Sequence, residues 1–144
     1  MDFFNRLITA LTETHPIHPM IVHFPIALTG AAFFFILLAL WRKKEFFEQA
    51  AFANIALATV STLVAGITGM YDNQINYVGN APNAGLKIFL ASTLLLVTTI
   101  TAISRWKRPE LFDTSKGFYV AAYFVSFSLA SILGFLGGVI LYGF

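Results

Sequence analysis

A short run near the N-terminus, residues 18–25 (HPMIVHFP), holds the residues of this 144-residue chain that are most capable of chemistry. Two imidazoles and two prolines stand there at the start of a long apolar segment. An ionisable side chain inside a bilayer is costly and commonly marks a ligand site or a proton path. The run therefore predicts a binding site at one end of a membrane helix, with His18 and His23 as its central residues.

The two prolines predict the shape of this segment. Pro19 suits the first turn of a helix, where its missing N–H group is no loss, and His18 would then cap that helix. Pro25 would lie inside the helix and cannot donate a hydrogen bond to the carbonyl of Ile21, so we expect a kink there. The freed carbonyl and a buried His23 would form a polar notch, which makes His23 the better candidate for chemistry.

Composition defines the class of protein. Hydrophobic residues make up 58% of the chain and charged residues 11%, whereas soluble domains have roughly 45–50% and about 25%. The chain is therefore predicted to be a membrane protein. Its net charge of +2 is too small to indicate nucleic acid, and the absence of cysteine excludes disulfides and iron–sulfur clusters. No Ser–His–Asp spacing and no phosphate-binding loop is present, so a non-catalytic role is favoured over an enzyme.

Four segments reach the length of about 20 apolar residues that a spanning helix needs, at about 20–41, 50–70, 86–104 and 118–144. They predict a single all-α domain, a four-helix transmembrane bundle, whose fourth helix is long enough to tilt or to project. Ahead of them, apolar residues at helical spacing predict a short interfacial helix (Phe3, Phe4, Leu7, Ile8, Leu11).

Basic residues predict the orientation of the bundle. Seven of the nine lie in the loops after spans one and three (Arg42, Lys43, Lys44, Arg105, Lys107, Arg108, Lys116). Positive loops stay in the cytoplasm. The prediction is a bacterial inner-membrane protein with both termini on the periplasmic side.

This topology gathers further polar residues beside the histidines, at the outer ends of the spans. Asp72 ends span two, as a site residue or as an ordinary interfacial residue. Lys87 opens span three, where it would snorkel, pair with Asp72 or hold an anionic headgroup, and the pair is favoured. His23 could instead bond to Asp72 or to a backbone carbonyl, and His15 is expected in a solvated loop.

Rows of small residues mark places of close approach. Ala27, Gly30 and Ala31 follow His23 on its predicted helical face, ahead of Phe34. Such a row admits another helix or a flat cofactor. Similar rows in spans two and four predict helix–helix contacts (Ala58, Thr62, Gly66, Gly69; Ala130, Gly134, Gly138).

The run HPMIVHFPIAL, residues 18–28, resembles the signature of the small bacterial membrane proteins called "domain of unknown function 2231". Residues 66–72 (GITGMYD) resemble the ending of that family's second helix, and the resemblance covers most of the chain. It implies a four-helix membrane fold without a settled activity. Many relatives carry a further histidine at the start of the third helix, where this chain has Lys87. The residue that the resemblance implies as a second axial ligand for a haem is therefore missing from this chain.

These observations predict an accessory or cofactor-binding subunit, most simply of an electron-transfer system. Its site near the outer face would use His18, His23, Asp72 and Lys87 to bind haem b, or otherwise a quinone or copper. A metal would be held by His18 and His23. The alternative is a non-redox structural subunit that binds lipid or pigment. Partners would be the lipid bilayer and either further copies of the chain or a larger membrane complex.

Overall fold

The computed structural model describes residues 2–9 and 17–142, and these residues form helices and short connections with no strand. The elements are α1 (Phe3–Thr9), α2 (Ile17–Ile21), α3 (His23–Arg42), α4 (Glu45–Tyr77), α5 (Ala84–Lys107), α6 (Leu111–Thr114) and α7 (Lys116–Tyr142). Four of the helices are long and apolar enough to cross a membrane, with α2 and α3 forming one of them. The predicted all-α membrane fold with a short N-terminal helix is thereby confirmed.

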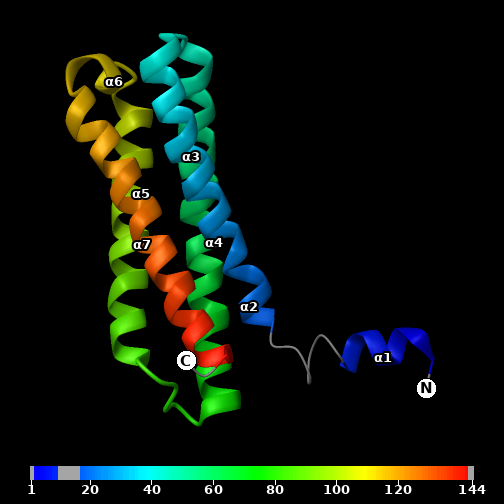
Figure 1. Cartoon of the computed structure of the whole chain (residues 1–144). Helices are drawn as coiled ribbons and strands as arrows, with labels where there is room; N and C mark the ends of the chain where they lie inside the picture. Colours follow the sequence, from blue (N-terminus) through cyan, green and yellow to red (C-terminus); the bar gives the residue numbers. More distant parts are fainter. Residues whose placement is uncertain (1, 10–16, 143–144) are drawn as a thin grey trace.

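The four long helices form a closed ring. Helix α4 packs between α3 and α5, and α7 packs against both α5 and α3. Figure 1 shows the chain running up and down through the bundle, so that α2 begins and α7 ends at the same end. The α4–α5 connection also lies at this end, which we call the histidine end. The α3–α4 connection and α6 lie at the other, which we call the basic end.

Helix α4 is longer than the sequence indicated, because it spans Glu45–Tyr77 and not about 50–70. Glu45 and Glu48 lie in its first turn, where carboxylates complement the helix dipole. The helix ends at Val78, whose left-handed backbone lets its N–H group bond to the carbonyl of Asn73. Thirty-three residues extend about 50 Å at about 1.5 Å each, well beyond a hydrocarbon core of about 30 Å.

The interruption expected from Pro25 is present but mild. Helix α2 ends at Ile21 and α3 begins at His23, with Val22 between them in right-handed helical geometry. Pro25 has no N–H group for the carbonyl of Ile21, which accounts for a break at this position. The two helices continue in nearly the same direction in Figure 1.

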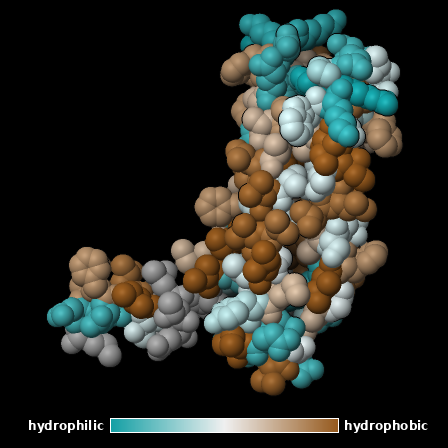
Figure 2. Space-filling model, turned by 180° about the vertical axis from the view of Figure 1, so that it is seen from behind, coloured by the Kyte–Doolittle hydropathy of each residue, from teal (hydrophilic) through white to brown (hydrophobic). Residues whose placement is uncertain are grey.

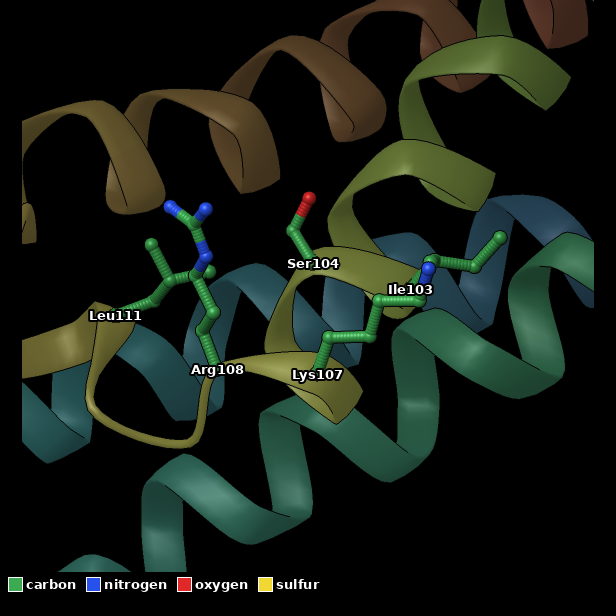
Figure 3. Close-up of a pocket in the computed structure, with 5 residues that line it drawn as sticks. All are labelled: Ile103, Ser104, Lys107, Arg108 and Leu111. Carbon is green, nitrogen blue, oxygen red and sulfur yellow. The ribbon is translucent and has the colours of Figure 1, made fainter.

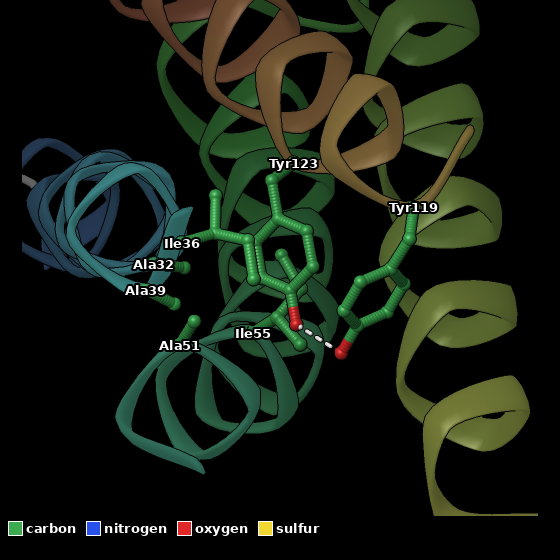
Figure 4. Packing of buried hydrophobic residues seen from close by; sticks show 7 residues of the cluster. All are labelled: Ala32, Ile36, Ala39, Ala51, Ile55, Tyr119 and Tyr123. Carbon is green, nitrogen blue, oxygen red and sulfur yellow. Dashed lines mark hydrogen bonds between the residues drawn. The ribbon is translucent and has the colours of Figure 1, made fainter. Parts of the chain in front are cut away.

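The buried core lies toward the basic end and is built from small residues around two tyrosines. Its members are Ala32, Ile36, Ala39, Ala51, Ile55, Tyr119 and Tyr123. Figure 4 shows alanines of α3 and α4 facing each other beside the Tyr123 ring. Small side chains let two helices approach closely.

The outer surface of the bundle suits a lipid environment. Figure 2 shows hydrophobic side chains over the middle of the bundle and hydrophilic ones gathered at its two ends. Helix α1 buries none of its residues, and Phe3 and Phe4 are each more than 70% exposed. It is drawn to the side of the bundle at the histidine end in Figure 1. Exposed aromatic side chains on a short helix are typical of an element that lies on a membrane surface.

Candidate functional site

His18 lies inside α2 and packs onto α4, so it does not cap its own helix. Its Nδ1 atom is 3.2 Å from Oγ1 of Thr68. The Thr68 hydroxyl donates its single proton to the carbonyl of Ala65 at 3.1 Å. With the Thr68 proton directed to Ala65, His18 Nδ1 takes the donor role in this contact, and Nε2 is then the unprotonated nitrogen of the neutral ring.

Gly69 makes this contact sterically feasible. A Cβ atom built at Gly69 would lie 2.8 Å from His18 Cε1 and 3.1 Å from its Nε2. Gly69 belongs to the row of small residues predicted on this helix, and the His18 ring of α2 packs against it. Gly66 has nothing within 4 Å of the same built atom.

His23 is exposed, and the expectation of a buried residue beside the Ile21 carbonyl is wrong. Its Nδ1 atom lies 2.6 Å from the carbonyl oxygen of Pro19. A carbonyl only accepts, so Nδ1 carries a proton, and in the neutral ring Nε2 has the lone pair. The reason for the exposure is helical geometry. Residues five apart are turned by about 140° at about 3.6 residues per turn, so a helix that presents His18 to α4 turns His23 away.

Asp72 and Lys87 lie near His18 without contacting each other directly. Both contribute to the electrostatic environment of His18. Each is half-buried, and the Asp72 carboxylate accepts a hydrogen bond of 2.6 Å from Asn76. Between these two described residues there is no ion pair within 4.0 Å, so the favoured Asp72–Lys87 pair is not formed. Asp72 also does not end its helix, which continues to Tyr77.

The described part of the chain holds no set of side chains that matches the predicted metal site. Within residues 2–9 and 17–142, no group of three or more His, Asp or Glu side chains could hold a metal ion. His18 and His23 have separate hydrogen-bond partners, on α4 and on their own segment. His15 lies outside the described residues.

The basic end holds a second polar cluster, which the sequence analysis did not find. Glu48 on α4 forms a two-point ion pair with Arg105 on α5 and accepts a 3.0 Å hydrogen bond from the Tyr119 hydroxyl. Tyr119 and Tyr123, one helical turn apart on α7, share a hydrogen bond of 2.8 Å, drawn in Figure 4. The guanidinium of Arg105 also lies over the ring of Phe52.

A sequence signal for this cluster existed. Glu48 falls within one turn of the predicted second span, and Arg105 within one turn of the end of the third. The up-and-down topology brings both to the same membrane face. From the sequence, Arg105 indicated only orientation, and Glu48 lay just outside the predicted second span.

The comparison with protein families settles which family the chain represents. The sequence model of a family described as "Predicted membrane protein (DUF2231)" matches residues 14–144. The chain belongs to this family. No curated protein and no solved structure was found to match it. The DUF2231 description specifies a membrane protein without an activity, so the function has to be argued from the residues.

Proposed function

We propose that this DUF2231 protein is an accessory subunit of a membrane electron-transfer system and binds a cofactor through Nε2 of His23. The observation that carries the proposal is the 2.6 Å hydrogen bond between His23 Nδ1 and the Pro19 carbonyl. It fixes the ring and leaves the other nitrogen exposed with a lone pair. Histidines that bind metals commonly donate their second ring nitrogen to a carbonyl in this way.

A haem b fits these residues as a group held on one side only. His23 would hold the haem iron through Nε2, and the surface next to it on α3 follows the row Ala27, Ala31 and Phe34. Ala27 and Phe34 are exposed and Ala31 is half-buried. Small side chains followed by an aromatic ring suit a flat macrocycle. His18 cannot supply a second ligand as placed, because its ring lies against Gly69. The opposite face would be open or would take a ligand from a partner subunit.

Two other ligands use the same nitrogen. A quinol hydroxyl would donate a hydrogen bond to His23 Nε2. Copper would find a thioether at Met20, which is exposed three residues before His23 on the same segment. Imidazole and thioether donors together favour copper. Asp72 and Lys87 would then act at longer range, by setting the local electrostatic potential.

The expected location follows from the basic end. The six basic side chains there other than the paired Arg105 favour a cytoplasmic position for this end. We propose that the protein lies in the bacterial inner membrane with the histidine end, and thus the cofactor, on the periplasmic side.

The test is a visible spectrum and an elemental and quinone analysis of the protein purified with its native partners in mild detergent. We expect a bound cofactor that His23→Ala removes. His18→Gln, which changes the neighbouring imidazole but not the exposed one, serves as the matched control and should retain it. Absence of haem, copper and quinone from the native complex, or full retention in His23→Ala, would overturn the proposal.

A non-redox structural role is the second candidate, and the exposed face of α3 favours it. Phe24 and Phe34 are exposed before and after the small, exposed Ala27 on this helix, and a small residue between larger ones suits close contact with a partner's helix. His23 Nε2 would then accept a hydrogen bond from that partner. Native mass spectrometry distinguishes the two, since this role gives a stable complex that contains a partner chain and no cofactor.

A further inference from the structure

A pocket of about 400 Å³ lies at the basic end, far from the histidines, and is lined by Ile103, Ser104, Lys107, Arg108 and Leu111. Figure 3 shows the Arg108 guanidinium and the Ser104 hydroxyl projecting to the same side of the chain. The pocket therefore combines cationic and hydroxyl donors with two aliphatic walls.

The pocket forms where α5 stops. Helix α5 ends at Lys107, and Arg108 leaves the helical conformation with φ −135° and ψ 83°. Pro109 follows, and a residue before proline is driven away from helical geometry. The chain then turns into α6, whose first residue, Leu111, closes one wall. The turn thus places two consecutive basic side chains at the pocket while the backbone bends around it.

The two cations of the pocket have no carboxylate partner. Arg105, one turn earlier, is occupied by Glu48. Neither Lys107 nor Arg108, both described and exposed, forms an ion pair within 4.0 Å, although Glu110 and Asp113 are close in sequence. An unpaired arginine and lysine beside a hydroxyl are the donor set that binds phosphate oxygens, with the guanidinium able to bind two at once.

The apolar part of the pocket indicates which phosphate compound it fits. Ile103 precedes Lys107 by four residues, about 6 Å nearer the middle of the bundle at about 1.5 Å per residue. Trp106, which precedes Lys107 in the chain, is 77% exposed, as is typical of tryptophan side chains at the boundary between lipid and water. Polar donors at the boundary, with the aliphatic Ile103 nearer the middle of the bundle, reproduce the order of groups in a phospholipid.

We propose that this pocket binds the phosphate headgroup of an anionic phospholipid. Arg108 pairs with the phosphate oxygens, and Ser104 donates a hydrogen bond to them. Lys107, which extends toward Ile103 in Figure 3, adds positive charge, and Ile103 contacts the beginning of an acyl chain. Orientation of the helices needs positive charge at this end but no pocket that joins it to a hydroxyl and an aliphatic side chain. A specific lipid site is therefore a property beyond topology, and it is independent of any cofactor at His23.

The experiment is native mass spectrometry of the full chain released from nanodiscs that contain phosphatidylcholine with or without phosphatidylglycerol. We expect the wild-type protein to retain phosphatidylglycerol. The double variant Lys107→Gln/Arg108→Gln should retain at least tenfold less of this lipid. The matched control is Lys43→Gln/Lys44→Gln, which removes the same charge at the same end outside the pocket and should retain the lipid. Circular dichroism checks that both variants are folded.

Three outcomes would overturn the proposal. Equal loss in the two double variants would mean that general charge attracts the lipid. Unchanged retention in Lys107→Gln/Arg108→Gln would mean that the lipid sits elsewhere. A third arm adds inorganic phosphate to the detergent-solubilised protein. Stabilisation by millimolar phosphate that depends on Arg108, without retention of phosphatidylglycerol, would assign the pocket to a soluble phosphate and not to a lipid.

Discussion

Arg105 clasps the carboxylate of Glu48 at two points, with Nε 2.5 Å from Oε1 and Nη2 2.6 Å from Oε2, although the residues are 57 positions apart. Their side chains are 12% and 4% exposed. The pair joins α4 to α5 at the basic end, opposite the α4–α5 connection. A buried carboxylate is tolerable only with such partners, so each residue depends on the other.

Breaking this pair from one side should destabilise the fold strongly. Arg105→Met leaves the Glu48 charge buried without its cation, which typically costs about 3–5 kcal/mol. The double variant Glu48→Leu/Arg105→Met should recover much of this loss, because no unpaired charge remains. Reversible unfolding in mixed micelles, followed by circular dichroism, measures both. A double variant as unstable as the single one would refute this account.

The two tyrosines of α7 should contribute unequally. The Tyr119 hydroxyl contacts both Glu48 and Tyr123, whereas Tyr123 bonds to Tyr119. Tyr119→Phe removes both hydrogen bonds and leaves the fully buried Tyr123 hydroxyl without a partner, at a cost of about 1–3 kcal/mol. Tyr123→Phe removes one bond and should cost less. The same unfolding measurement ranks them, and the reverse order would contradict the geometry.

Gly69 and Gly66 provide a matched pair for the histidine end. Gly69→Ala places a methyl group against the His18 ring, which must leave its position over α4 and lose its bond to Thr68. Gly66→Ala meets no atom and should be neutral or stabilising by up to about 1 kcal/mol, because alanine favours helices over glycine. Gly69→Ala should therefore lower the thermal stability, whereas Gly66→Ala should leave it unchanged or raise it. Equal effects would show that the ring does not lie where we describe it.

The orientation can be tested with single cysteines, since the chain has none of its own. We expect Asn80→Cys, in the α4–α5 connection, to react with a membrane-impermeant maleimide in intact spheroplasts. Lys44→Cys, at the start of α4, should react only after the membrane is opened. Labelling in the opposite pattern would place the histidine end in the cytoplasm.

Composition and segment length were enough to predict the helices, because a bilayer permits few backbone arrangements. The break before Pro25 also followed from local chemistry. The direction in which each histidine side chain faces was harder to infer. One histidine of the pair had to face α4 and the other had to face outward. Burial was predicted for His23, whereas Gly69 makes room for the ring of His18. That choice depends on a contact between residues 51 positions apart.

The Glu48–Arg105 cluster was missed for a different reason. Charged residues at the ends of spans were interpreted through orientation alone, and orientation depends on the number of charges and not on their pairing. Only the register of α4 against α5 reveals that Arg105 is neutralised while Lys107 and Arg108 are not.

The ion pair between Arg105 and Glu48 also has a consequence for how the helices insert into the membrane. Helices α4 and α5 are joined by residues 78–83 at one end and by the ion pair at the other. Without its partner, α4 would insert with an unpaired Glu48 carboxylate and α5 with an unpaired Arg105 guanidinium. We therefore expect the two to partition from the translocation machinery as a hairpin, and α7, which brings Tyr119, to dock onto it afterwards.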